Sequence, residues 1–395
     1  MKTFLLAWRY ICFHRVKTLL LIACVSLTVA LPIAIYLLLN QFNRQIIARA
    51  EATPVVIGAK GSRLDLTLSS LYLHNKCTET IEFGEVAYVK KTRYADVIPM
   101  HLGYTAQGRP IVGTTFSYFD RRNLDFADGN VFRRLGDCVI GWNVAQEQGL
   151  SVGDRTKSDR QRELDIAGNP PLYLRVTGIL KRQRTADDDA VFTDLKTTWI
   201  LAGIGHGHED VVGSSNKLKV LNPDQKDGPT VASPAVTGDL EVTENNLNSF
   251  HFHGETEKFP ITAIVAFPPD QKNRDLLMGR YVATRPTLQI VEPTQVVQDL
   301  MALVFCAKKF FDANSMIISL ATFLMLVMVI MLSLKLRERE METMFKIGCS
   351  RMTIVKLQAA ELAIIGAASL VVITILVSLI WVTAGTIVQS LLISS

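Results

Sequence analysis

Residues Lys335–Glu361 read KLREREMETMFKIGCSRMTIVKLQAAE and separate two apolar runs, Met316–Leu334 and Leu362–Ala384. Each run is long enough to cross a bilayer as a helix. Six basic side chains lie in the stretch between them: Lys335, Arg337, Arg339, Lys346, Arg351 and Lys356. By the positive-inside rule, a basic loop of this kind faces the cytoplasm. The stretch therefore predicts a helical hairpin on the cytoplasmic side of a membrane.

Local signals divide this hairpin into two helices. Glu342 and Lys346 stand four residues apart, the spacing at which opposite charges pair on a helix. Gly348 is expected to end the first helix, and Ser350 is expected to cap the start of the second. Three apolar side chains lie near the tip: Met344, Phe345 and Ile347.

A third apolar run, Thr18–Leu39, follows a basic N-terminal segment. The run is longer than the apolar part of a signal peptide, and no small-residue cleavage site follows it before Asn40. We therefore expect a retained span, with Pro32 as the point where the helix could kink.

Three spans and two basic borders predict the order of the whole chain. The fold class is an α-helical transmembrane bundle with three spans and a large α+β extracytoplasmic domain. The expected order is a cytoplasmic amphipathic helix (1–17), a first span (18–40), the extracytoplasmic domain (41–312), a second span (313–334), the cytoplasmic hairpin (335–361), a third span (362–384) and a short tail (385–395). This topology predicts a multi-pass membrane protein with a cytoplasmic N-terminus.

The outer domain alternates short apolar runs with turns, which is typical of an α+β domain. The runs are Val86–Val89, Val97–Met100, Pro110–Val112, Cys138–Ile140, Leu172–Ile179, Trp199–Leu201 and Ile261–Phe267. Helices are expected at Trp142–Gln148, capped by Gly149, at Asp270–Thr284, and from Pro293 back toward the membrane. Residues 203–254 break the pattern, because Gly, Pro, Ser, Asn and Asp dominate them, and they predict a loop-rich insertion.

Composition excludes several other classes of protein. The net charge of +5 reflects the two basic borders and requires no nucleic-acid partner. The spans contain almost no ionisable residue, which argues against an ion-coupled transporter. The chain has no nucleotide-binding motif and no nucleophile–base pair, so we expect no enzyme activity of its own. Asp187, Asp188 and Asp189 could hold calcium, but a solvated loop is the expected arrangement. Cys77 and Cys138 are expected as buried thiols, with a disulfide left open.

Four histidines fall in two His-x-His pairs within or beside the insertion: His206, His208, His251 and His253. In an extended backbone, residues two apart point to the same face, so each pair could offer two imidazoles to one ion. Zinc and other transition metals accept imidazole ligands. The alternative is that these histidines are ordinary residues of exposed loops.

The hairpin also carries a family resemblance. The charged run Arg337–Glu342, the sequence Ile347-Gly348-Cys349-Ser350-Arg351 and Glu361 resemble the loop after the second transmembrane helix of MacB/FtsX-type ABC permeases. In the outer domain, Asp128–Phe132, Cys138–Asp154 and Val176–Leu180 are similar to structural motifs of the same family. Permeases of this family usually have a fourth span, which residues 385–395 are too short to form.

The resemblance implies a permease subunit of the bacterial inner membrane that transmits ATP-driven motion to its periplasmic domain for export, extraction or mechanotransmission. It implies an ABC ATPase subunit that binds the ATP, a second permease copy or paralogue, membrane lipid and a possible periplasmic partner protein. The implied coupling residues are Arg337, Glu338, Glu342, Met344, Phe345, Ile347, Gly348, Ser350 and Arg351. The alternative is a membrane-anchored periplasmic receptor or zinc-linked binding protein that works without an ATPase.

Overall fold

The computed structural model describes residues 2–394 except 14, 74–78, 161–170, 207–239, 245, 337–341, 344, 347 and 349. Contacts between residues divide the chain into two compact units. The helical unit comprises Met1–Ile46 and Asp299–Val388, and the sheet domain comprises Ile47–Gln298 with Gln389–Ser395.

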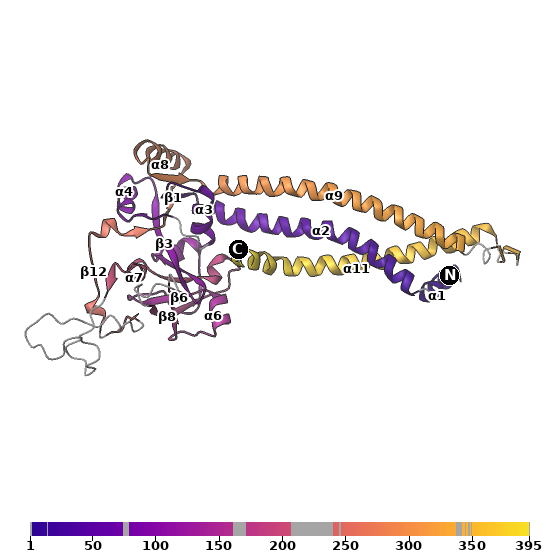
Figure 1. Ribbon diagram of the computed structural model, residues 1–395, viewed down its shortest axis with the longest axis horizontal. Coiled ribbons are helices and arrows are strands. Elements are labelled where there is room, and N and C mark those ends of the chain that lie inside the picture. The colour runs from indigo at the N-terminus through magenta and orange to yellow at the C-terminus, as the bar shows by residue number, and fades with distance from the viewer. Residues whose placement is uncertain are drawn as a thin grey trace, which may run out of the picture. The chain divides into compact units, whose positions relative to one another are not determined.

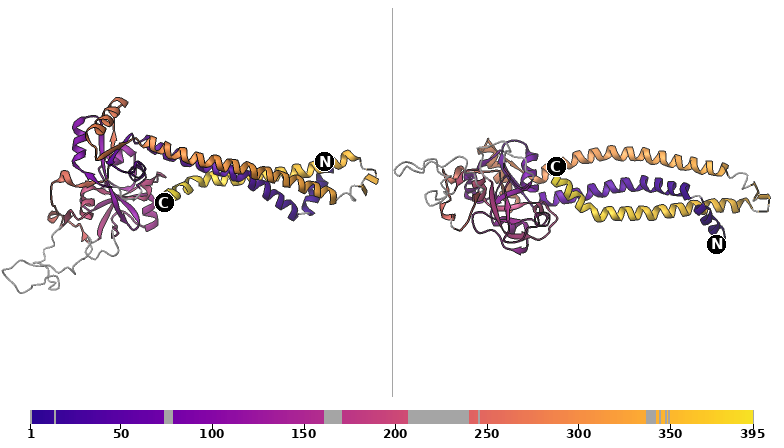
Figure 2. Two further views of the ribbon diagram at one scale, coloured as in Figure 1. Left: turned by 45° about the horizontal axis from the view of Figure 1, so that its top comes forward. Right: turned by 60° about the horizontal axis from the view of Figure 1, so that its bottom comes forward.

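The helical unit is built from α1 (Lys2–Phe13), α2 (Arg15–Glu51), α9 (Pro293–Leu336) and α11 (Arg351–Ser394). Figures 1 and 2 show the three long helices running side by side. Thr28 Oγ1 of α2 lies 3.3 Å from Thr322 Oγ1 of α9. One apolar cluster joins α1, α2 and α11: Ala7, Ile11, Leu21, Leu357, Ile364 and Ile365. A helix is therefore present where the N-terminal one was predicted, but α2 begins at Arg15, three residues before the predicted start of the first span, and the cytoplasmic position of α1 stays a prediction.

Among the described residues, two helical segments are long and apolar enough to span a membrane, Thr18–Glu51 and Val355–Thr383. Few of their residues are buried, unlike those of a core helix in a water-soluble protein. Large apolar side chains such as Leu19 and Val371 are exposed on them, which supports association with a membrane. The predicted second span, residues 313–334, lies inside the continuous helix α9, and its crossing of a membrane stays a prediction.

The sheet domain centres on an eleven-stranded mixed sheet in the order β11-β8-β6-β9-β4-β3-β14-β1-β15, with β5 and β7 also paired to β8. Its strands are β1 (Val55–Ala59), β3 (Asp96–Ala106), β4 (Arg109–Thr114), β5 (Phe126–Gly129), β6 (Asp137–Ile140), β7 (Arg155–Lys157), β8 (Leu172–Leu180), β9 (Val191–Asp194), β11 (Leu240–Glu241), β14 (Ala263–Phe267) and β15 (Leu288–Val291). Two short ribbons pair β2 (Ile81–Glu82) with β13 (Pro260–Ile261) and β10 (Gly205–His206) with β12 (His251–Phe252). The predicted α+β class of this domain is confirmed.

Strand β3 joins the two halves of the sheet. Its first residues pair with β14, and after an irregularity between His101 and Tyr104 it pairs with β4. Gly103 lies inside that irregularity with φ +118°, a backbone conformation that glycine adopts without strain. The bulge therefore lets one strand serve both halves.

In the described part of this domain, six short α-helices cover the sheet: α3 (Arg63–Tyr72), α4 (Gly84–Thr92), α5 (Ser117–Arg122), α6 (Trp142–Gln148), α7 (Leu195–Leu201) and α8 (Gln271–Thr284). Single 3₁₀ turns occupy Ala186–Asp189, Leu247–Ser249 and Thr256–Lys258. Helices α4 and α8 pack on the β1–β14 half, and α6 packs on the β6–β8 half (Figure 1). Helix α7 contributes Trp199 to the hydrophobic core of the β1–β14 half and Ile200 to the hydrophobic core of the β6–β8 half.

The predicted ends of three helices are confirmed. Gly149 caps α6 with φ +64°, Asp270 caps α8, and Pro293 opens α9. Cys138 is a buried free thiol, so a disulfide does not involve it, and Cys77 lies outside the described residues.

Two predicted apolar runs are helical rather than extended. Val86–Val89 lies in α4, where Val86 and Val89 are buried on one face, three residues apart. Trp199–Leu201 lies in α7, whose residues are buried almost all round, so that its sequence shows no helical period. The run Ile261–Phe267 is divided at Thr262 between β13 and β14.

Candidate functional site

The cytoplasmic hairpin shows the local features that its sequence predicts. Lys346 Nζ pairs with Glu342 Oε1 at 3.0 Å, and Gly348 has φ +104°. Ser350 directly precedes α11, and its Oγ accepts a hydrogen bond from the Thr353 amide at 3.3 Å. The Phe345 side chain is half exposed, as an apolar contact for a partner requires. These findings confirm the predicted caps and ion pair, while the coupling role stays a prediction.

The structure describes only some of the other predicted coupling residues. Arg337, Glu338, Met344 and Ile347 lie outside the described residues, and Arg351 is described only as the first residue of α11.

A buried charge cluster that sequence reasoning missed lies in the sheet domain, at the last turn of α2. Arg49 donates two hydrogen bonds to Asp187, from Nη1 to Oδ2 at 2.6 Å and from Nη2 to Oδ1 at 2.9 Å. The Arg49 Nε group also donates to the carbonyl of Leu71. Tyr118 donates its hydroxyl to Asp187 Oδ1 at 2.7 Å. This network, the Arg49–Asp187 anchor, fixes the end of α2 to α3, α5 and the 3₁₀ turn Ala186–Asp189.

Both charges of the Arg49–Asp187 anchor are almost inaccessible, since their side chains are 8% and 2% exposed. Burial alone would raise the pKa of Asp187, but the Arg49 guanidinium outweighs it and lowers that pKa to about 2. Burial alone would lower the pKa of Arg49, but the Asp187 carboxylate holds it above its usual value. Arg122, which donates to Thr53 Oγ1 at 2.7 Å, has its pKa lowered by burial and then by Arg49. The anchor is therefore an ion pair at neutral pH.

The two following acids are also buried, so the expected solvated loop at 187–189 is wrong. Asp188 accepts hydrogen bonds from the amides of Gln183 at 2.9 Å and Arg184 at 2.6 Å. Asp189 accepts from Arg109 at 3.2 Å and Asn143 at 3.0 Å. The carboxylates thus point at nitrogen donors from separate elements, an arrangement unlike the oxygen shell of a calcium site.

The turn that carries these acids lies directly against α6. A Cβ built on Gly141, the residue that precedes α6, would lie 2.3 Å from the carbonyl oxygens of Asp187 and Asp188. Glycine is thus required where α6 approaches the anchor.

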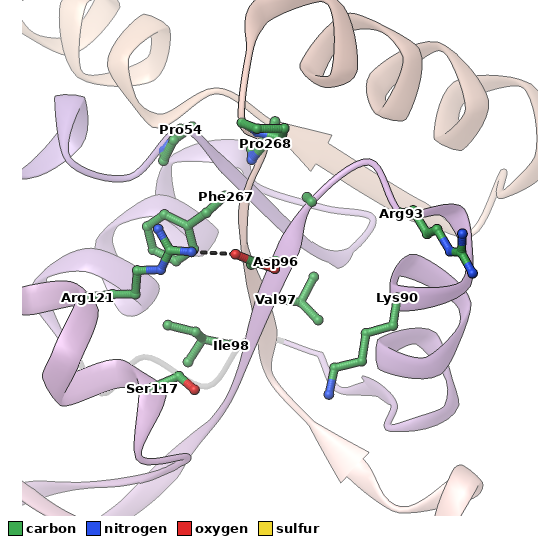
Figure 3. Close-up of a pocket in the computed structure, with 12 residues that line it drawn as sticks. Pro54, Lys90, Arg93, Asp96, Val97, Ile98, Ser117, Arg121, Phe267 and Pro268 are labelled. Atoms are coloured by element: carbon green, nitrogen blue, oxygen red, sulfur yellow. Dashed lines mark hydrogen bonds and ion pairs between the residues drawn. The ribbon is translucent and has the colours of Figure 1, made fainter.

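A pocket of about 1000 Å³ opens in the same domain beside β3, α4 and α5 (Figure 3). Arg121 forms an ion pair with Asp96, and its guanidinium lies 5.2 Å from the centre of the Phe267 ring. Lys90 and Arg93 from α4 and the following turn add two more positive charges to the lining. Excess positive charge beside an apolar wall suits a ligand with an anionic group.

The predicted histidine ligands are partly brought together. Strand pairing sets His206 of β10 opposite His251 of β12, and the rings of His251 and His253 have centroids 4.6 Å apart. His208 lies outside the described residues. No three His, Cys, Asp or Glu side chains gather as a metal cluster in the described part of the chain.

Comparison with known proteins identifies the family. The family model of the MacB-like periplasmic core domain matches residues 18–224. No curated protein matches the chain.

Three similar solved structures are domains of transporters or permeases, and each is 10% identical in sequence. The periplasmic region of MacB from Actinobacillus actinomycetemcomitans has a TM-score of 0.36 and covers 65% of this chain and 97% of its own. The extracellular domain of the noncanonical ABC-type transporter YknZ from Gram-positive bacteria has a TM-score of 0.32, with coverages of 60% and 98%. A domain of a putative permease from Porphyromonas gingivalis has a TM-score of 0.27, with coverages of 60% and 86%. Because the matched family model spans more than half of the 395 residues, the chain belongs to the MacB-like permease family of ABC transporters.

Proposed function

We propose that this chain is the transmembrane subunit of a MacB/FtsX-type ABC transporter, and that it transmits the motion of a separate ATPase subunit to its extracytoplasmic sheet domain. The observation that carries the proposal is how two long helices join the sheet. Helix α2 ends at Glu51, four residues before β1, and α9 begins at Pro293, two residues after β15. Strands β1 and β15 are hydrogen-bonded neighbours, with Val56 opposite Val291. A displacement of one helix against the other therefore acts directly on one strand pair.

The Arg49–Asp187 anchor supports this role. The short connections from α2 to β1 and from β15 to α9 can transmit a displacement along the chain, but on their own they leave the end of each helix free to rotate. Bidentate pairing between a planar guanidinium and a carboxylate fixes direction as well as distance. The last turn of α2 is thus tied to the 3₁₀ turn at 186–189, which leads directly into β9.

The cytoplasmic end of the proposal rests on the hairpin. Family membership implies an ATPase partner, and the half-exposed Phe345 beside the Glu342–Lys346 ion pair offers an apolar contact with a charged border. The hairpin would accept the motion of the ATPase, and the chain itself would bind no nucleotide. Two permease copies, identical or paralogous, would match a symmetric pair of ATPase domains.

The test is affinity purification of the chain from its native membranes, in detergent or lipid nanodiscs, with identification of any ABC ATPase that co-purifies, followed by an ATPase assay. Phe345→Asp should abolish or strongly reduce co-purification, because a charge would be placed in the apolar contact. Val282→Asp is the matched control, since Val282 is exposed on α8 of the sheet domain, which we place on the other side of the membrane.

If Phe345→Asp retains both the partner and normal stimulation of ATP hydrolysis, the docking site is wrong. If the wild-type chain retains no ATPase at all, the alternative of a membrane-anchored receptor without an ATPase takes its place.

A further inference from the structure

We propose that the pocket shown in Figure 3 binds a phosphate monoester with an apolar body, and that Lys90 and Arg93 hold the phosphate. The pocket has a volume of about 1000 Å³, at the upper end of the range for small-molecule sites. Phe267, Pro268 and Val97 give it apolar walls. A cavity of this size that combines apolar walls with a few charged groups is typical of a ligand-binding site.

The pocket lies across the ends of three adjacent strands, β3, β14 and β1. Phe267, the last residue of β14, is opposite Asp96, the first residue of β3. The preceding residue of β14, Ala266, is opposite Val55, the first residue of β1. Pro54 also lines the pocket, and it directly precedes β1 and follows α2 by three positions. A ligand in the pocket would therefore contact the connection between α2 and the sheet.

Strand β3 divides the lining of the pocket into two sides (Figure 3). Val97 and Ile98 are both buried, and as consecutive residues of a strand they point to opposite faces. On the side of α5, the positive charge of Arg121 is balanced by its ion pair with Asp96. The α5 side therefore carries no net charge, and it offers mainly apolar surface.

The unbalanced positive charge lies on the side of α4. Among the residues that the structure describes, neither Lys90 nor Arg93 has a carboxylate partner. The Arg93 amide donates to the Lys90 carbonyl at 3.1 Å, so the turn that ends α4 keeps the two residues close together.

The charge of the whole lining matches that of a phosphate monoester. Lys90, Arg93 and Arg121 are positive and Asp96 is negative, so three charges less one give a net charge of +2. A phosphate monoester carries a charge of about −1.5 to −2 at neutral pH. A guanidinium binds two phosphate oxygens at once, and an ammonium adds a point charge. The phosphate is thus expected on the α4 side, with the apolar body toward Phe267.

Basic residues at the end of a helix also have a second use, because they stabilise its negative C-terminal dipole. Helix α4 has two lysines in its last turn, Lys90 and Lys91. Lys91 is exposed and is not among the residues that line the pocket. A comparison of variants at these two positions therefore separates ligand binding from stabilisation of the helix.

Ligand binding at this site does not depend on the proposed function, whereas an effect of the ligand on the movement of α2 would rest on it. The experiment is a calorimetric titration of the full-length chain in phosphatidylcholine nanodiscs with 1-naphthyl phosphate, with empty nanodiscs as the blank. One molecule per chain should bind, with a dissociation constant below about 0.1 mM. 1-Naphthol, which lacks the charge, and inorganic phosphate, which lacks the apolar body, should each bind at least about tenfold more weakly.

A second titration distinguishes two sources of the phosphate. If phosphatidylglycerol added to the nanodiscs competes with 1-naphthyl phosphate, the phosphate group comes from a lipid. If the affinity stays the same, the ligand is soluble. Either outcome supports the site, because both require 1-naphthyl phosphate to bind in the absence of the anionic lipid.

Three variants test the lining. Lys90→Gln/Arg93→Gln should weaken binding of 1-naphthyl phosphate at least about tenfold, because it removes both unbalanced charges. Ser117→Asp adds a negative charge on the α5 side of the same pocket and should weaken binding at least about threefold. Lys91→Gln is the matched control and should bind as the wild type does. Unchanged urea midpoints would show that the variants remain folded.

The proposal would be overturned by any of three results. The first is that the wild-type chain does not bind 1-naphthyl phosphate, or binds 1-naphthol or inorganic phosphate equally well. The second is that Lys90→Gln/Arg93→Gln and Ser117→Asp bind as tightly as the wild type does. The third is that Lys91→Gln weakens binding as much as the double variant does.

Discussion

Removing one partner of the Arg49–Asp187 anchor should destabilise the sheet domain far more than the loss of a surface ion pair would. Arg49→Met removes the charge and keeps an unbranched side chain, and it leaves the Asp187 carboxylate buried without its cation. That carboxylate is 2% exposed and would retain only hydroxyl donors, from Tyr118 at 2.7 Å and Thr185 at 3.0 Å. Breaking a buried ion pair on one side costs about 3–5 kcal/mol. Asp187→Asn should cost a similar amount, because it leaves the guanidinium unpaired.

The exposed pair Lys181–Asp125 provides the control. Lys181 Nζ lies 3.2 Å from Asp125 Oδ2, but the two side chains are 57% and 71% exposed. Lys181→Met should therefore lower the free energy of unfolding by less than about 1 kcal/mol. Urea unfolding of the full chain in detergent, followed by tryptophan fluorescence, measures these differences. Trp199, which is buried in the domain core, reports the transition.

The double variant Arg49→Met/Asp187→Leu completes a thermodynamic cycle. Because it removes both charges together, its loss of stability should fall below the sum of the two single losses by at least about 2 kcal/mol. Additive losses would show that the two side chains act separately. If Arg49→Met or Asp187→Asn lowered the free energy of unfolding by no more than Lys181→Met does, the reasoning that the buried pair is indispensable would be refuted.

Two further predictions concern pH and assembly. His101 is 2% exposed, and burial lowers its pKa from 6.5 to about 4, so the folded domain resists a proton that the unfolded chain accepts. The contribution of His101 to the free energy of unfolding should therefore be fully present above pH 6.5 and fall by about 3 kcal/mol as the pH drops to 4. Urea midpoints measured across this pH range would show the loss, and His101→Gln should remove it. The assembled transporter should contain two permease chains, with close approach of α11 helices at Gly366 and Ala367, whose positions are exposed. Native mass spectrometry that finds one permease per ATPase pair would contradict this.

Features set by neighbouring residues could be predicted from the sequence. The Glu342–Lys346 pair, the Ser350 cap and the Gly149 cap each depend on residues within four positions of one another. The apolar runs also report directly on the long helices, because length and composition suffice to identify them. These signals need no knowledge of the tertiary fold.

Features set by distant partners could not be predicted. Asp187 has the composition of a solvated loop around it, and its partner Arg49 is 138 residues earlier in the chain. An arginine near the end of a long helix gave no sign of burial, since such a residue also serves as a favourable charge at a helix C-terminus. For the histidines, the His-x-His spacing predicted metal binding, which stays a prediction, and only strand pairing shows that positions 206 and 251 are opposite one another.

The anchor also bears on why a charged pair occupies a position that apolar residues could fill. A buried ion pair is often no more stabilising than well-packed apolar side chains of similar volume. Its distinctive property is direction, since the bidentate contact between Arg49 and Asp187 admits one orientation of the last turn of α2. Arg49→Met/Asp187→Leu should therefore separate two properties that the single variants lose together. If the anchor transmits motion, the double variant should recover much of the folding stability and still fail to couple ATP hydrolysis to transport, whereas recovery of both would mean that the pair serves only to hold the domain together.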